Sequence, residues 1–277
     1  MTEILVVANE TIGGRRLLDS IRQRAKIHGA INVRIVVPQN RPRHGSVIYA
    51  ETVHDAAQVR LDLALSFLHE EGVEASGEVG DADPFAATLD AIGDHTPDEI
   101  IISTLPVTAS GWMRRDLIDR VAEASGLSVQ HVVSDIDAEG LPFDVTLVVA
   151  AQTATSDALH EDLKARAAKA GDQLFIVVVP QSSREGAAAG EARTRLATVL
   201  DTMHKDGLLA SGLIGDPDPF TATMNALQFF RVGRVVISTL PATKSGWLRA
   251  DLIERVRKYA ACEVDHVVAE PSTVPTS

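Results

Sequence analysis

The sequence has one cysteine, two tryptophans and far fewer basic than acidic residues. With Cys262 alone, the chain cannot form an intramolecular disulfide or a cysteine-based zinc cluster. The net charge of −12 argues against a nucleic-acid or membrane-surface binder, because such proteins present basic surfaces to polyanions. Apolar runs such as Ile4–Ala8 are far shorter than the roughly 20 residues of a membrane span. Since Met1–Glu3 also lacks a basic, signal-like start, we expect a cytoplasmic protein.

What the sequence does contain is an internal repeat. Gly80–Phe85 returns as Gly215–Phe220, 135 residues later, and Ile102–Pro106 returns as Ile237–Pro241 at the same spacing. Upstream, Leu5-Val6-Val7-Ala8 returns 142 residues later, so the second copy is 7 residues shorter. Two tandem copies of one domain are the simplest explanation. The expected organisation is a first domain at residues 1–136, a linker at 137–142, a second domain at 143–270 and a disordered tail at 271–277.

Each copy alternates short apolar runs with amphipathic stretches, which predicts an α/β fold with a parallel sheet covered by helices on both faces. The third helix should begin at Pro84, with Asp83 as its N-cap. The expected strands of the first copy are Ile4–Ala8, Asn32–Val37, Glu74–Val79, Glu99–Ser103 and Val129–Val133, and the expected helices include Gly14–His28, Ala56–Glu70 and Trp112–Ser125.

In such a doubly wound sheet, ligands bind beyond the carboxyl ends of the strands, where the strand order reverses. The loops after strands 1 and 4 meet there, at Ala8–Gly14 and Ser103–Asp116 of the first copy. The second of these loops is closely repeated in the other copy. The only two tryptophans, Trp112 and Trp247, occupy matching positions within it.

These motifs resemble the universal stress protein family, and the whole chain resembles a tandem member. The similarity runs from the first strand to the last in both copies, and Asn9–Gly14 with Ser103–Leu117 resembles an actinobacterial variant. The resemblance implies two five-stranded sheets of strand order 3-2-1-4-5, adenine-nucleotide binding in some members, and dimerisation through the last strand. For this chain it implies an intramolecular pseudo-dimer and allows a homodimer.

The chain departs from the family's nucleotide-binding motif, Gly-x-x-Gly-x9-Gly-(Ser/Thr). Proline removes a backbone donor and aspartate repels phosphate, which argues against triphosphate binding in the usual mode. The residue after strand 1, which such members direct at adenine as an acid, is Asn9 in one copy and Ala151 in the other. The motif positions hold Ser103, Pro106, Asp116 and Leu117 in the first copy and Ser238, Pro241, Asp251 and Leu252 in the second.

The candidate ligand-binding residues lie in the loops after strands 1, 2 and 4. Because Gly13 and Gly14 permit close approach to a helix start, the first copy is the better candidate. The candidates are Asn9, Thr11, Gly13, Gly14, Pro38, Ser103, Thr104, Ser110, Gly111, Trp112 and Arg114 in the first copy, and Ser238, Thr239, Ser245, Gly246, Trp247 and Arg249 in the second.

Several candidates have a structural alternative. Arg114 and Arg249 could clamp an anion, or Arg114 could pair with Asp116 at the surface. The tryptophans could stack on a base or pack under a loop. For His131 and His266 a hydrogen-bonded structural role is favoured over a titrating one.

No catalytic motif or metal-ligand spacing is found, so we predict no enzyme and no metal, with slow nucleotide hydrolysis as a weaker third hypothesis. The predicted function is a stress-related regulatory or ligand-sensing protein, whose only candidate cofactor is ATP or another adenine nucleotide. The alternative is an interaction scaffold with degenerate pockets.

The pseudo-dimer hypothesis predicts that residues 1–140, expressed alone, self-associate or are poorly soluble, because the last strand loses its partner edge. Analytical ultracentrifugation of the fragment measures this. A stable monomer would contradict burial of that edge.

Overall fold

The computed structural model describes residues 1–39, 50–106, 116–171, 173–183 and 186–270. Within these ranges the chain divides into two compact units, of which the first ends at Pro142 and the second begins at Phe143. The boundary thus falls at the carboxyl end of the predicted linker, and each unit contains one complete copy of the repeat.

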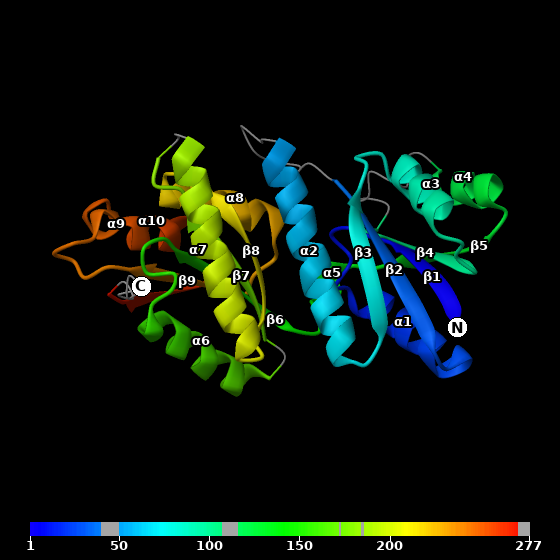
Figure 1. Ribbon diagram of the computed structural model, residues 1–277, viewed down its shortest axis with the longest axis horizontal. Helices are drawn as coiled ribbons and strands as arrows, with labels where there is room; N and C mark the ends of the chain where they lie inside the picture. Colours follow the sequence, from blue (N-terminus) through cyan, green and yellow to red (C-terminus); the bar gives the residue numbers. More distant parts are fainter. Residues whose placement is uncertain (40–49, 107–115, 172, 184–185, 271–277) are drawn as a thin grey trace. The chain divides into compact units, whose positions relative to one another are not determined.

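The first unit is a five-stranded parallel sheet with the order β3-β2-β1-β4-β5 (Figure 1). This is the order 3-2-1-4-5 that the resemblance implies, so the prediction is confirmed. Each observed strand lies within one or two residues of its predicted bounds. The strands are β1 (Thr2–Val7), β2 (Ile31–Pro38), β3 (Glu74–Gly80), β4 (Glu99–Thr104) and β5 (Ser128–Val133).

The second unit repeats this topology. Its sheet has the order β10-β9-β6-β7-β8, all parallel, which is the same arrangement listed from the opposite edge. The doubly wound fold is therefore confirmed in both copies. The strands are β6 (Asp144–Ala150), β7 (Gln173–Pro180), β8 (Leu209–Gly215), β9 (Arg234–Thr239) and β10 (Glu263–Val268).

Helices connect the strands in both units. Asp83 accepts a hydrogen bond from the Phe85 amide at 3.4 Å, and Asp218 accepts one from the Thr221 amide at 3.0 Å, so the predicted cap is confirmed and recurs. Within the described part of the chain, no helix has the length and apolarity that crossing a membrane requires. The helices are α1 (Arg15–His28), α2 (Ala50–Glu70), α3 (Pro84–Asp94), α4 (Leu117–Ser125), α5 (Ile136–Glu139), α6 (Asp157–Ala170), α7 (Gly186–Lys205), α8 (Pro219–Phe229), α9 (Gly246–Arg249) and α10 (Leu252–Tyr259).

Three segments differ from the sequence-based expectation. Helix α2 begins at Ala50 rather than Ala56. Helix α4 begins at Leu117 rather than Trp112, because Asp116 has a φ of 47°, a left-handed conformation that no α-helix can contain. The predicted linker is not an extended connector. Its first three residues, 137–139, belong to α5, which begins at the buried Ile136 in the predicted first domain; the N-cap Asp135 accepts a hydrogen bond from the Ala138 amide.

Both faces of each sheet are buried, as a parallel sheet requires. In the first unit one face packs against α3 and α4, where Leu5 and Ile100 meet Ala87 and Val121. In the second unit the opposite face packs against α6 and α7. The central strands consequently have no solvent-facing side, and polar side chains gather at the strand ends.

Helices α2 and α7 approach their sheets so closely that the facing strand needs a glycine. A side-chain carbon added at Gly77 would lie 2.6 Å from Leu61 Cδ1 of α2, and one added at Gly212 would lie 2.7 Å from Leu196 Cδ1 of α7. Both would also collide with a carbonyl oxygen of the neighbouring strand. The two glycines therefore fix where α2 and α7 rest on their sheets.

Replacing Gly212 by alanine should lower the free energy of unfolding by about 1–3 kcal/mol, because the added carbon overpacks the α7 contact. Gly190→Ala is the matched control. It lies within α7 itself, has open space around it, and should stabilise by about 0.5–1 kcal/mol through helix propensity. Urea unfolding of both variants measures the difference. Equal stabilities would contradict the close approach.

Candidate functional site

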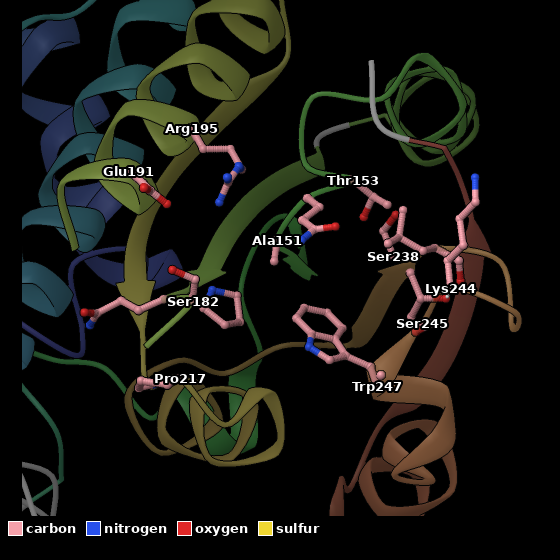
Figure 2. Close-up of a pocket in the computed structure, with 16 residues that line it drawn as sticks. Ala151, Thr153, Ser182, Glu191, Arg195, Pro217, Ser238, Lys244, Ser245 and Trp247 are labelled. Atoms are coloured by element: carbon pink, nitrogen blue, oxygen red, sulfur yellow. Dashed lines mark hydrogen bonds between the residues drawn. The ribbon is translucent and has the colours of Figure 1, made fainter. Parts of the chain in front are cut away.

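The structure contains a cavity of about 360 Å³ at the carboxyl ends of β6, β7 and β9 (Figure 2). Strands β6 and β9 are neighbours in the sheet, and the chain reaches β9 only after building the other side through β7 and β8. The cavity therefore lies at the point where the strand order reverses, which is where doubly wound sheets bind ligands. It is formed entirely by the second copy.

Five sequence-predicted candidates of the second copy line this cavity, from the end of β9 to the start of α9. The side chain of the sixth, Arg249, lies outside the described part of the structure. The counterparts of Asn9, Thr11 and Pro38 also line it, as Ala151, Thr153 and Pro180. The five candidates are Ser238, Thr239, Ser245, Gly246 and Trp247.

Two buried hydroxyl groups in the cavity wall have no hydrogen-bond partner. Ser238 is 1% exposed and Thr153 is 2% exposed, yet within the described ranges neither hydroxyl is bonded. Leaving a buried polar group unpaired costs about 1–3 kcal/mol, so such groups commonly mark a place where something else binds. The first-copy counterpart of Thr153 differs, because the Thr11 hydroxyl donates to the Ser103 carbonyl at 3.1 Å.

Trp247 provides an aromatic face to the cavity. Figure 2 shows its indole ring directed into the space from α9. The side chain of Ser245 caps α9 by accepting from the Leu248 amide at 3.2 Å, which fixes the turn that carries the tryptophan. Trp247 is partly buried, so part of its surface remains accessible for stacking.

Arg195 enters the cavity from α7, opposite Trp247 (Figure 2). Within the described ranges its guanidinium makes no hydrogen bond or ion pair, although Glu191, one turn earlier, also lines the cavity. Sequence reasoning missed this residue. A signal was present, because Arg60-Leu61 recurs as Arg195-Leu196 at the 135-residue spacing of the repeat.

In the first copy the corresponding arginine is held by the protein itself. Arg60 Nη1 donates to Asn9 Oδ1 at 2.7 Å, and Asn9 Nδ2 donates to the Pro38 carbonyl. Asn9 is 1% exposed. Burial lowers the pKa of Arg60 to about 10, an effect that the nearby Glu10 opposes, so the guanidinium stays protonated at neutral pH. The buried positive charge is stabilised by these neighbours.

The remaining first-copy candidates do not form one described cavity. Gly14 gives close approach to the protein rather than to a ligand, because an added side-chain carbon would lie 2.9 Å from both Ser134 Oγ and Ile136 Cδ1. Gly13 is partly buried, and Ser103 and Thr104 are buried at the end of β4. Four candidates fall outside the described residues: Ser110, Gly111, Trp112 and Arg114.

The loop after the fourth strand keeps a glycine-like backbone without a glycine. Asp116 and Asp251 have φ angles of 47° and 51°, and both stand where the family's nucleotide-binding motif has its third glycine. Each of these aspartates therefore places a carboxylate at a left-handed turn before α4 or α10. An acidic side chain at this turn repels phosphate.

Each last strand is tied to the end of the fourth strand by a histidine. His131 Nε2 lies 2.9 Å from Thr104 Oγ1, and His266 Nε2 lies 2.8 Å from Thr239 Oγ1. The threonine hydroxyls donate to the next carbonyl, so the imidazole donates from Nε2. Burial lowers the pKa of both histidines, and Arg257 adds to the effect at His266. The structural role predicted for both residues fits this bonding.

Metal binding has no support in the described residues, where no group of three or more His, Cys, Asp or Glu side chains could hold an ion.

Comparisons with known proteins give distant likenesses. No family model and no curated protein matches the chain. A universal stress protein structure from Archaeoglobus fulgidus DSM 4304 matches with 14% identity and a TM-score of 0.36, covering 98% of this chain and 97% of that one. A functionally unknown protein from Pseudomonas aeruginosa PAO1 matches with 16% identity and a TM-score of 0.29, covering 98% and 93%. Neither match carries a ligand or activity to this chain. The doubly wound α/β fold of both units rests on the strand order of their sheets.

The burial of His131 and His266 predicts a loss of stability in mild acid, because burial lowers the pKa of both. Because the folded pKa lies below the ordinary 6.5, the unfolded chain binds more protons as the pH falls through 6.5, and the stabilisation by neutral histidine is lost. Urea unfolding between about pH 7.5 and about pH 5.5 should show a smaller loss for the double variant His131→Gln/His266→Gln than for the unmodified protein. NMR titration midpoints at or above 6.5 would contradict the assignment.

Proposed function

We propose that the chain is a ligand-sensing regulatory protein of the universal stress protein type, acting in a stress response. Its second copy binds a small anionic ligand, and an adenine nucleotide is the first candidate. The observation that carries this proposal is the Arg195 guanidinium, which extends into a cavity without a partner among the described residues. A guanidinium has five fixed donors that suit phosphate or carboxylate.

The other cavity groups complement such a ligand. The unpaired hydroxyls of Thr153 and Ser238 supply hydrogen bonds, and Trp247 supplies a surface on which a base can stack. The volume of about 360 Å³ lies within the roughly 300–1,000 Å³ of typical small-molecule sites. A compact ligand with one aromatic and one anionic end uses all of these groups at once.

The proposed binding mode differs from a phosphate loop. Pro241 lacks the backbone N–H that a glycine would offer, and Asp251 places a carboxylate at the helix start. Contacts to the anion therefore come from side chains, above all Arg195. Fewer backbone donors favour a ligand with fewer phosphates than a triphosphate.

The first test is direct. Purified protein is denatured, released small molecules are identified by mass spectrometry, and AMP, ADP and ATP are titrated by calorimetry. The Arg195→Gln variant should weaken binding about tenfold to a hundredfold, because a charged hydrogen bond contributes about 1.5–3 kcal/mol. Arg193→Gln, an exposed position on the same helix, is the control.

The second readout is fluorescence. In a Trp112→Phe background Trp247 is the only tryptophan, so a stacked base should quench its emission with the same midpoint as the calorimetric titration. No released molecule, no heat and no quenching at high nucleotide concentration would instead support the scaffold alternative.

A further inference from the structure

The two copies hold the same arginine in different states. Arg60 on α2 and Arg195 on α7 occupy equivalent positions, each followed by the leucine that packs against a strand glycine. The residue just beyond β1, two positions after its last residue, faces this arginine in the first copy. It is Asn9 there and Ala151 in the second copy. The two copies therefore differ at the position of Asn9 and Ala151, although the arginine, leucine and glycine around it are the same in both.

Asn9 uses both ends of its amide. Its oxygen accepts from Arg60 at 2.7 Å, and its nitrogen donates to the Pro38 carbonyl at the end of β2. The oxygen stands where an anionic ligand would meet the guanidinium, so the side chain acts as an internal ligand. An incoming anion would have to displace this bond and leave the buried amide oxygen of Asn9 unpaired, which opposes binding.

The neighbouring position reinforces the difference. Glu10 interacts favourably with the charge of Arg60, whereas its counterpart Gln152 is neutral. The methyl group of Ala151 accepts no hydrogen bond, and the second-copy arginine has no partner within the described ranges. The threonine hydroxyls differ in the same way, since Thr11 is bonded and Thr153 is not, whereas the hydroxyls of Ser103 and Ser238 are unpaired in both copies.

We infer that the residue after the first strand decides which copy binds, with Asn9 occupying the first-copy arginine and Ala151 leaving Arg195 to the ligand. The chain therefore binds one anion, in the second copy. This inference rests on the proposed function for its ligand. Its structural half, the capture of an arginine by asparagine, can be tested without any ligand.

The ligand-free test uses phenylglyoxal, which modifies accessible guanidinium groups, with peptide mass spectrometry to locate the product. Arg195 should react readily and Arg60 slowly. Asn9→Ala should increase the reaction of Arg60 at least several-fold, while Asn9→Asp, which still accepts from the guanidinium, should keep it protected. Ala151→Asn should slow the reaction of Arg195. Unchanged reactivities in Asn9→Ala and Ala151→Asn would overturn the inference.

The binding test uses AMP and calorimetric stoichiometry. The unmodified chain should bind one AMP, and Ala151→Asn should weaken binding about tenfold or more. Ala151→Leu adds similar bulk without an acceptor and should weaken it less. Asn9→Ala should raise the stoichiometry towards two. If Leu and Asn at position 151 weaken binding equally, the effect is steric and the inference fails.

The two tests separate the proposals. The predicted phenylglyoxal pattern without any AMP binding would refute nucleotide binding and leave the asparagine capture standing. One bound AMP whose affinity is unchanged by Ala151→Asn would do the reverse.

Discussion

The close approach of α7 to β8 is the contact on which the rest of the site depends. Gly212 has no side chain, so Leu196 can settle directly against the strand. Arg195 precedes Leu196 in α7, so the contact between Leu196 and Gly212 also determines where Arg195 lies on the sheet. A helix held further from the sheet would carry the arginine away from the strand ends. The packing at Gly212 therefore determines where the positive charge of Arg195 lies relative to the cavity.

The two copies agree in their packing contacts more than in the polar side chains at their strand ends. The glycine and leucine contacts, the aspartate caps and the left-handed aspartates occur in both copies. The residues that meet the arginine differ. Core positions are coupled to many neighbours, so a change in one is costly, whereas a strand-end side chain has few contacts to satisfy. Two copies of one framework can thus surround the equivalent arginine differently.

Much of this fold could be predicted from the sequence. The repeat gave the two units, apolar alternation gave the strands, and Asp83-Pro84 gave a helix start. The site was harder to predict. Arg60 and Arg195 look like ordinary helix-surface arginines, and only the tertiary contact with Asn9 distinguishes them. The unpaired hydroxyls of Thr153 and Ser238 are also invisible in sequence, because a missing partner depends on distant segments. Helix α5 was overlooked because acidic and glycine residues are typical of linkers as well as caps.

Thr239 has a consequence beyond the cavity that it lines. Its hydroxyl oxygen accepts from His266, and His266 belongs to β10, an edge strand of the second sheet. A ligand group that competed for this hydroxyl would weaken the attachment of that strand near its carboxyl end. Ligand binding in the cavity would then loosen the edge strand β10 through this one side-chain contact, without any rearrangement of the helices.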